Sequence, residues 1–254
     1  MKIAFVGKGG VGKSTLAATF ARLLARRGRE VVAIDFDPMP GLSYGLGLPV
    51  QDVTIPADAM VDVEGGPIDD RFKFVGDLDA IAALERFAPV GADGVRFLSY
   101  GKLRGHVSTQ FRSQAAFRHI TASLPGDRFD LVGDLPAGTR QAFFGWAKFA
   151  DTVAIVTDPS MKAMHTARRL GRLSDATWAP QRLVVVVNRC SSADDAPRAA
   201  ALTSLEVVAS LPDDRAVSLA DRQAIAPLDA DPDGAYASAV AHLVDLFCAE
   251  EVSA

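Results

Sequence analysis

The residues that specify chemistry most clearly form the run Gly7-Lys8-Gly9-Gly10-Val11-Gly12-Lys13-Ser14-Thr15, which lies between an expected strand and an expected helix. Glycines in such a loop let the backbone turn tightly, so that successive N–H groups and the helix N-terminus point at a polyphosphate. Lys13 would bridge the outer phosphates, the Ser14 hydroxyl would bind Mg²⁺, and Thr15 would bond the innermost phosphate. The sequence therefore predicts a phosphate-binding loop. Its expected nucleotide-binding residues are Gly9, Gly10, Val11, Gly12, Lys13, Ser14 and Thr15.

Two acidic segments follow other expected strands. The first is Asp35-Phe36-Asp37-Pro38 and the second is Asp134-Leu135-Pro136-Ala137-Gly138. The carboxyl ends of parallel strands form the ligand crevice of an open α/β sheet. We therefore expect Asp134 to hold Mg²⁺ through a water, and the loop after it to sense a terminal phosphate. Without the phosphate-binding loop, either segment could also be an ordinary turn after a strand.

Short apolar runs alternate with helical patterns along the chain. The first unit is Lys2–Val6, a helix from Ser14 that stops at Gly28, and Glu30–Phe36, and this order predicts parallel pairing. Further strands are expected at Val95–Tyr100, Leu131–Gly133, Thr152–Thr157, Leu183–Val187 and Val207–Leu211. Their nearly continuous Val, Ile and Leu content is typical of strands buried on both faces. The predicted fold class is α/β, a doubly wound and mostly parallel sheet with helices on both faces.

The length of the chain fits a single domain over residues 1–254, because 254 residues that are 49% hydrophobic can bury a full core. Residues 47–93 are weakly periodic and rich in Pro, Gly and Asp, so we expect an irregular, insertion-like segment of long loops and short helices. The last helical pattern carries one apolar stripe, which predicts a helix packed on the sheet. The stripe comprises Tyr236, Val240, Leu243, Val244 and Phe247.

Composition limits the partners and the compartment. A net charge of -4 gives no overall attraction to phosphate backbones, so nucleic-acid binding is not expected. Cys190 and Cys248 are not spaced as a CxxC pair and indicate a reducing compartment. There is no apolar run of about 18 residues and no leader before the first strand. We therefore expect a soluble cytoplasmic protein that does not associate with membranes.

Lys8 is an unusual member of the loop, because an ordinary phosphate-binding loop needs only Lys13. The run Lys8–Thr15 resembles the deviant Walker A signature of the MinD, ParA and nitrogenase iron protein superfamily of P-loop ATPases. In that superfamily this lysine crosses a two-fold interface to the phosphates bound by the other subunit. The resemblance implies ATP or ADP with Mg²⁺, slow hydrolysis of ATP to ADP and phosphate, and an ATP-dependent homodimer. As a single residue, Lys8 could also be a solvated surface lysine.

The resemblance also implies roles for other residues. Asp37 would position or activate the attacking water and act with Lys8 and Lys13 in catalysis, while Asp35 would support the magnesium shell or the loop geometry. The expected Mg²⁺ set, mostly through water, is Ser14, Asp35, Asp37 and Asp134. Asn188 would meet the purine edge, with Arg189 stacking nearby. The backbone of the segment Leu211-Pro212-Asp213-Asp214 would pack on the base. Taken singly, these base-site residues could equally be turn formers.

Within the superfamily, the order of motifs resembles the accessory ATPases that mature carbon monoxide dehydrogenase, over most of the chain. That resemblance includes the pair Asp221 and Arg222 after the expected Val207–Leu211 strand, and it implies an unidentified client metalloenzyme. The resemblance does not extend to the metal ligands, because Phe97–Ser108 contains no cysteine and Ala137 stands where the iron protein has a cluster ligand. No Fe–S cluster is therefore expected. Cys190 and Cys248 are interpreted as small buried hydrophobes and His106 as a solvated histidine.

The sequence is also compatible with other biological roles for such an ATPase. A positioning or partitioning ATPase acting on DNA or a scaffold would need an exposed basic surface. Arginines that could supply one are Arg104, Arg112, Arg118, Arg168, Arg169 and Arg172. Membrane cycling of the MinD kind would need a basic amphipathic anchor, whereas the last helix ends in Glu250 and Glu251. A regulatory module without hydrolysis is disfavoured by the intact Lys8, Lys13, Asp37 and Asp134.

Overall fold

The computed structural model describes residues 1–37, 41–49, 55–63, 72–100, 107–138 and 142–253. Three residues named above, Pro38, Arg104 and His106, lie outside this part of the chain, and so does the side chain of Arg112.

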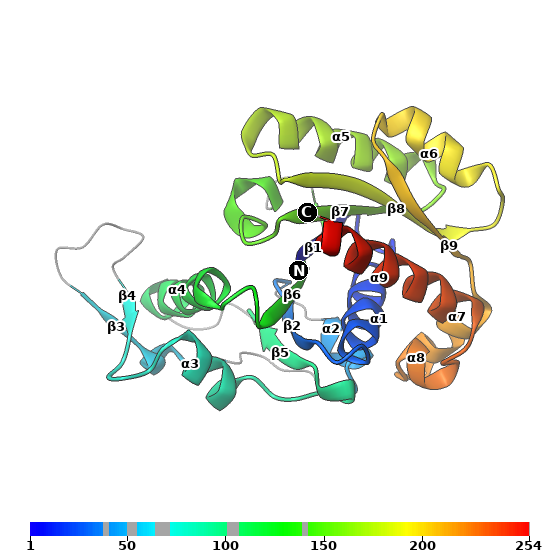
Figure 1. The fold of residues 1–254 in the computed structure, drawn as a ribbon. Helices are drawn as coiled ribbons and strands as arrows, with labels where there is room; N and C mark the ends of the chain where they lie inside the picture. Colours follow the sequence, from blue (N-terminus) through cyan, green and yellow to red (C-terminus); the bar gives the residue numbers. More distant parts are fainter. Residues whose placement is uncertain (38–40, 50–54, 64–71, 101–106, 139–141, 254) are drawn as a thin grey trace.

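A seven-stranded parallel sheet forms the centre of the fold, in the order β5-β2-β6-β1-β7-β8-β9 (Figure 1). The strands are β1 (Lys2–Gly7), β2 (Glu30–Asp35), β5 (Arg96–Ser99), β6 (Phe129–Asp134), β7 (Thr152–Thr157), β8 (Arg182–Cys190) and β9 (Val207–Pro212). Every strand expected from the apolar runs is present, and the predicted α/β class is confirmed. The main difference is β8, which continues beyond Val187 and takes Asn188 and Arg189 into the strand.

Helices cover both faces of this sheet. On one face lie α1 (Lys13–Ala25) and α9 (Ala235–Ser253); on the other lie α4 (Val107–Ser123), α5 (Met161–Thr177) and α6 (Asp195–Thr203). The shorter helices are α2 (Leu42–Gly45), α3 (Ala80–Phe87), α7 (Arg215–Arg222) and α8 (Pro227–Ala230), with single turns at Ala57–Ala59, Ala92–Gly94 and Ala142–Trp146. Successive strand residues alternate between the two cores: Ile3 and Phe5 face α1, whereas Ala4 and Val6 face the other layer.

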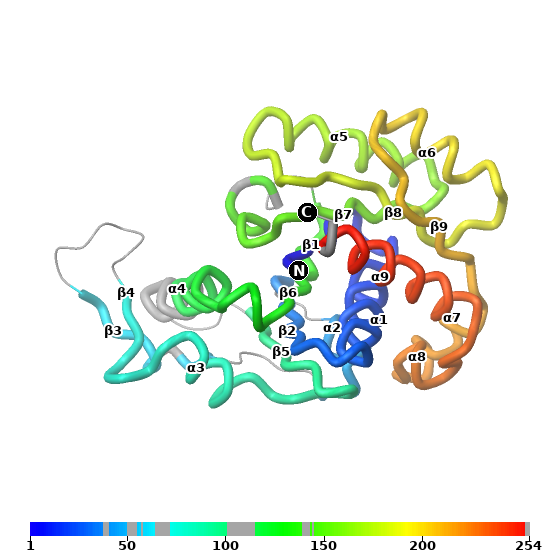
Figure 2. Tube along the Cα trace, viewed as in Figure 1, coloured from blue at the N-terminus to red at the C-terminus, as the bar shows by residue number. Residues whose placement is uncertain are grey.

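The stripe on α9 is buried as its spacing predicts. Its five apolar side chains are at most 4% exposed, and the ring of Phe247 lies 6.0 Å from that of Phe20 in an edge-on contact. Figures 1 and 2 show α9 lying alongside α1, which begins at the phosphate-binding loop. None of the helices in the described residues is long and apolar enough to cross a bilayer.

The insertion-like segment 47–93 contains short helices, as expected, and also an antiparallel pair that was not predicted. The pair is β3 (Met60–Asp62) with β4 (Phe72–Phe74), and it lies against α4 beyond the edge of the main sheet (Figure 2). A ring nitrogen of His119 lies 2.8 Å from the carbonyl oxygen of Phe72. Strands of three residues are too short to produce a recognisable alternation, which explains why the sequence did not reveal them.

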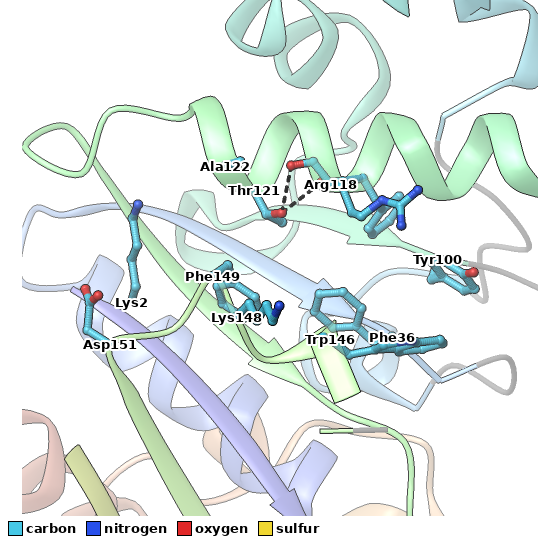
Figure 3. Close-up of a pocket in the computed structure, with 12 residues that line it drawn as sticks. Lys2, Phe36, Tyr100, Arg118, Thr121, Ala122, Trp146, Lys148, Phe149 and Asp151 are labelled. Atoms are coloured by element: carbon cyan, nitrogen blue, oxygen red, sulfur yellow. Dashed lines mark hydrogen bonds between the residues drawn. The ribbon is translucent and has the colours of Figure 1, made fainter. Parts of the chain in front are cut away.

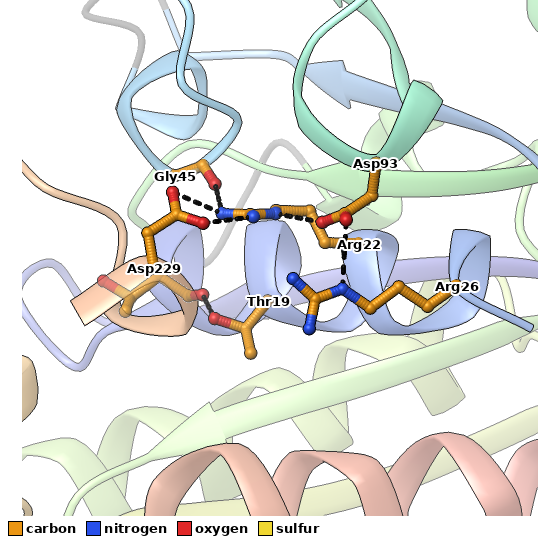
Figure 4. A network of polar contacts seen from close by, with 7 residues as sticks. Thr19, Arg22, Arg26, Gly45, Asp93 and Asp229 are labelled. Carbon is orange, nitrogen blue, oxygen red and sulfur yellow. Dashed lines mark hydrogen bonds and ion pairs between the residues drawn. The ribbon is translucent and has the colours of Figure 1, made fainter. Parts of the chain in front are cut away.

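A buried arginine ties α1 to three other segments (Figure 4). Arg22 is 2% exposed, and its Nε donates to Asp93 at 2.6 Å. Its two terminal nitrogens bond both carboxylate oxygens of Asp229 in α8, at 2.9 and 2.5 Å. One of them also bonds the carbonyl oxygen of Gly45 at 3.3 Å. Because a planar guanidinium satisfies all these acceptors at once, Arg22 fixes the helix that carries the phosphate-binding loop.

Replacing Arg22 by Met should destabilise the protein, because the apolar chain leaves the Asp229 carboxylate and the Gly45 carbonyl without this donor and leaves Asp93 with Arg26 alone. We expect a loss of about 3 kcal/mol in the free energy of unfolding, measured by urea denaturation. Arg26→Met is the matched control, since Arg26 bonds the same Asp93 from a side chain that is 39% exposed, and it should cost at most about 1 kcal/mol. Equal losses in the two variants would contradict a special role for the buried arginine.

Candidate functional site

The loop between β1 and α1 follows a path that requires glycine. Gly7 has φ 153°, and a Cβ there would lie 2.2 Å from the carbonyl oxygen of Val156. Gly12 has φ 90°, and a Cβ there would lie 2.4 Å from Nδ2 of Asn188. Any side chain at either position would therefore push the loop away from β7 and β8. The glycines keep the loop close to the carboxyl ends of the central strands, where ligands bind in this kind of sheet.

Two lysines meet at this loop. Lys13, at the first position of α1, is 8% exposed, and its Nζ donates to the carbonyl oxygen of Lys8 at 3.3 Å. The side chain of Lys8 is half-buried and makes no ion pair with any residue in the described part of the chain. The N-terminus of α1 adds partial positive charge and unpaired N–H groups at the same point. Together these features make an anion site suited to a polyphosphate.

Two carboxylates are buried side by side near these lysines. Asp35 and Asp134 occupy paired positions at the ends of β2 and β6, with 0% and 2% exposure. Burial raises the pKa of Asp134 to about 8; the negative charge of Asp35 adds to the rise, while the Ser14 hydroxyl and Lys13 oppose it. Burial also raises the pKa of Asp35 to about 6, against hydrogen bonds from backbone N–H groups such as that of Leu42. A cation between the two acids would stabilise their charged forms and so lower both pKa values.

The two acids differ in their partners. The carboxylate of Asp35 accepts hydrogen bonds from the backbone N–H groups of Asp37 at 2.9 Å and Leu42 at 3.0 Å. In contrast, Oδ1 of Asp134 is buried with no hydrogen-bond partner among the described residues. Asp35 therefore organises its own loop, whereas Asp134 has an oxygen available for a ligand. The charge of Asp37 raises the pKa of both acids, so its carboxylate lies near them.

The donor set fits Mg²⁺. Ser14 supplies a hydroxyl that is hydrogen-bonded to Asp134, and the free Oδ1 can accept from a metal-bound water. No group of three or more His, Cys, Asp or Glu side chains in the described ranges is arranged to hold a metal ion. One serine hydroxyl and one carboxylate suit an ion that keeps several waters and takes its remaining ligands from phosphates. The side chains that would hold it are those of Ser14 and Asp134.

The loop after Asp134 touches the phosphate-binding loop. The N–H of Gly138 donates to the carbonyl oxygen of Gly7 at 3.5 Å. A Cβ placed on Gly9 would lie 3.3 Å from the Cβ of Ala137. The phosphate-binding loop is therefore in contact with the segment that the sequence indicated as a phosphate sensor.

A cavity of about 430 Å³ runs from the phosphate-binding loop to the ends of β8 and β9. It is lined by Gly10, Gly12, Lys13, Ser14, Thr15, Asn188, Arg189, Pro212, Asp213, Asp214, Val217, Ser218, Asp221, Arg222 and Tyr236. The structure thus brings together most of the residues expected to contact a nucleotide. The side chain of Leu211 is fully buried in the core and does not line the cavity. The prediction for Leu211 concerned its backbone and stays a prediction. The side chain of Val11 is buried in the same core.

The base-site residues have structural roles that the sequence did not reveal. Asn188 is 4% exposed, and its Nδ2 donates to the carbonyl oxygen of Val11 at 2.8 Å, so it holds the phosphate-binding loop in place. Arg189 lies at an irregularity in the pairing of β8 with β9 and has φ 57°. Such bulges redirect a side chain, and Arg189 lines the cavity as a result.

Tyr236 was not predicted as a site residue, and Asp214 was expected only through the backbone of the segment that packs on the base. Tyr236 lines the cavity, and its hydroxyl is buried with no hydrogen-bond partner in the described residues, although its spacing indicated only a core position. Asp214 begins α7 by accepting from the N–H of Ala216 at 2.8 Å, and it also accepts from the N–H of Tyr236 at 3.3 Å. The available signal was a phenol hydroxyl in a stripe whose other side chains are hydrocarbon, since a buried tyrosine hydroxyl usually has a partner.

Comparisons with known proteins agree with this geometry. The carbon monoxide dehydrogenase accessory protein CooC of Rhodospirillum rubrum is 27% identical over 247 residues, covering 91% of each chain. An uncharacterised ATP-binding protein of Methanocaldococcus jannaschii is 27% identical over 203 residues, covering 76% of this chain and 77% of its own.

Two solved structures share the fold. A ParA family ATPase from Chlorobium tepidum has a TM-score of 0.72 at 20% identity and covers 96% of each chain. The septum site-determining protein MinD from Pyrococcus horikoshii, complexed with Mg-ADP, has a TM-score of 0.70 at 22% identity, over 97% of this chain and 95% of its own. The family model described as the CobQ/CobB/MinD/ParA nucleotide binding domain matches residues 3–228. The chain therefore belongs to the CobQ/CobB/MinD/ParA nucleotide-binding domain family.

Proposed function

We propose that this chain is a Mg²⁺-dependent ATPase that works as a nucleotide-sandwich homodimer and acts on a client metalloenzyme. The observation that carries the proposal is the buried Oδ1 of Asp134 beside Ser14 and Lys13, which has no hydrogen-bond partner among the residues that the structure describes. A carboxylate in that position is costly unless a cation and its ligands complete the site. Residues 1–254 would act as one functional domain.

In this proposal the chain binds ATP along the cavity. Lys13 and the N–H groups of the loop hold the phosphates, while Asn188, Arg189 and Pro212 line the end where the base lies. Bound Mg²⁺ would neutralise charge on the terminal phosphates. Asp37, near both buried acids, orients a water for in-line attack on the terminal phosphorus. The name of the Methanocaldococcus relative and the Mg-ADP bound to MinD support this choice of nucleotide and metal.

The proposal of a dimer is based on Lys8. Its half-buried side chain has no anionic partner in the described residues, although it lies beside a site built for anions. A second subunit facing this loop would bring its own nucleotide phosphates to Lys8. Charge neutralisation of that kind also stabilises phosphoryl transfer.

The choice of client rests on the relative CooC, named as a carbon monoxide dehydrogenase accessory protein and similar over 91% of both chains. An accessory role for a metalloenzyme is therefore favoured over DNA partitioning, for which the ParA likeness supplies the fold alone. Hydrolysis should then respond to the client rather than to DNA.

Lys8→Ala should abolish ATP-driven dimerisation and reduce phosphate release by about a hundredfold or more. Light scattering with ADP, with Mg·ATP and with a nonhydrolysable analogue would measure the dimer, and a phosphate assay would measure turnover. Lys162→Ala, an exposed lysine on α5, is the matched control and should behave like the wild type. If Lys8→Ala dimerises and hydrolyses normally, the sandwich dimer is wrong.

Gly12→Ala should weaken binding of Mg·ADP by about tenfold or more, because the new Cβ displaces Asn188 from the loop. Gly28→Ala is the control: Gly28 has φ 82° and no atom within 4 Å of the added Cβ. Both variants should lose about 1–2 kcal/mol of stability from the left-handed backbone, and Gly12→Ala should lose more because Asn188 is also displaced. Calorimetry should show weaker binding for Gly12→Ala alone; equal affinities would contradict the contact between Asn188 and the loop as a determinant of binding.

A further inference from the structure

A second cavity, of about 540 Å³, lies on the opposite layer of the sheet from α1 (Figure 3). Its walls include five aromatic side chains from four parts of the fold: Phe36, Tyr100, Phe117, Trp146 and Phe149. Their rings contact one another, with Phe36 stacked on Phe149 at 5.6 Å and Tyr100 lying 5.1 Å from Trp146. The volume and the aromatic lining are those of a small-molecule site.

The fold explains why this space is open. The single turn Ala142–Trp146 stands between β6 and β7, where a full covering helix would otherwise lie. Gly133 on β6 has no side chain to fill the gap, and a Cβ there would lie 2.6 Å from Cζ of Phe149. The rings therefore rest directly on the sheet, and α4 forms the opposite wall through Phe117 and Thr121 (Figure 3).

The charges around the cavity favour an anion. Lys2, Arg118 and Lys148 line it, against the single carboxylate of Asp151. Arg118 and Lys148 are exposed, and neither has an ion-pair partner among the residues that the structure describes. The hydroxyl of Thr121 is already bonded to the carbonyl oxygens of Phe117 and Arg118, at 3.0 and 3.2 Å. A ligand would thus meet flat apolar rings inside and positive charge at the rim.

Two backbone hydrogen bonds connect this cavity to the carboxylates of the nucleotide site. The N–H of Phe36 donates to the carbonyl oxygen of Asp134 at 3.0 Å, and the N–H of Tyr100 donates to that of Asp35 at 2.8 Å. The aromatic walls and the buried acids therefore sit on the same strand ends. We expect a shift of either strand end to move both an aromatic wall of the cavity and a carboxylate of the nucleotide site.

We propose that this cavity is an effector site for a small planar aromatic anion, and that its occupancy is coupled to nucleotide binding. Aromatic rings of the ligand stack on Phe36, Trp146 and Phe149, while its anionic group pairs with Arg118 and Lys148. Binding of the anion in this cavity does not depend on ATP hydrolysis. Its coupling to nucleotide binding rests on the proposed function only in that the phosphate-binding loop binds a nucleotide.

The test uses 2-naphthoate and its cationic counterpart 2-naphthylmethylammonium as probes, with Trp146 as the reporter. The chain has two tryptophans, so Trp178→Phe leaves Trp146 alone. We expect saturable quenching by naphthoate and at least threefold weaker affinity for the cation. The double variant Arg118→Gln/Lys148→Gln should weaken naphthoate binding about threefold or more. The control variant Lys162→Gln/Arg172→Gln removes the same charge from α5, outside the cavity lining, and should leave the affinity for naphthoate unchanged.

Coupling is measured by repeating the naphthoate titration with saturating Mg·ADP, and the ADP titration with saturating naphthoate. Each ligand should change the affinity of the other by the same factor, of about twofold or more. Absence of quenching, equal affinity for the two probes, or equal weakening in both double variants would overturn the binding site. Naphthoate affinity that does not respond to Mg·ADP would overturn the effector role.

Discussion

The repulsion between Asp35 and Asp134, buried side by side at the ends of β2 and β6, is the constraint on which the site depends. Two carboxylates in so little water cannot both stay ionised without nearby positive charge. Lys13 and the N-terminus of α1 supply positive charge near the acids. The loop glycines allow that approach, and Asn188 holds the loop in place through Val11.

The two acids share this constraint unequally, and the difference separates their roles. Backbone N–H groups satisfy Asp35, so its charge shapes the loop after β2. Asp134 has a hydrogen bond with Ser14 and one oxygen without a partner in the described part of the chain. A divalent ion with its bound phosphates would supply the missing partner of the Asp134 carboxylate. The loop after Asp134 contacts Gly7, so it would then respond to the terminal phosphate.

The sequence predicted the parts of this structure that depend on local pattern. Strands from Lys2 to Leu211 were visible as apolar runs, and the loop from Gly7 to Thr15 as a motif. Features that depend on distant contacts were not visible. Asn188 bonds a carbonyl 177 positions earlier, and Tyr236 lines the cavity from a helix that otherwise packs in the core. Arg22 looked like any charged residue on a helix, because its partners Asp93 and Asp229 come together only in the folded chain.

If Asp134 completes a Mg²⁺ site, the affinity for ADP should depend on Mg²⁺ through this carboxylate. Calorimetric titration of ADP, with and without Mg²⁺, would compare the wild type with the isosteric variant Asp134→Asn. We expect Mg²⁺ to strengthen ADP binding by about tenfold, or ~1.4 kcal/mol, in the wild type and to have little effect in the folded variant. An equal gain from Mg²⁺ in both proteins would contradict this role of Asp134.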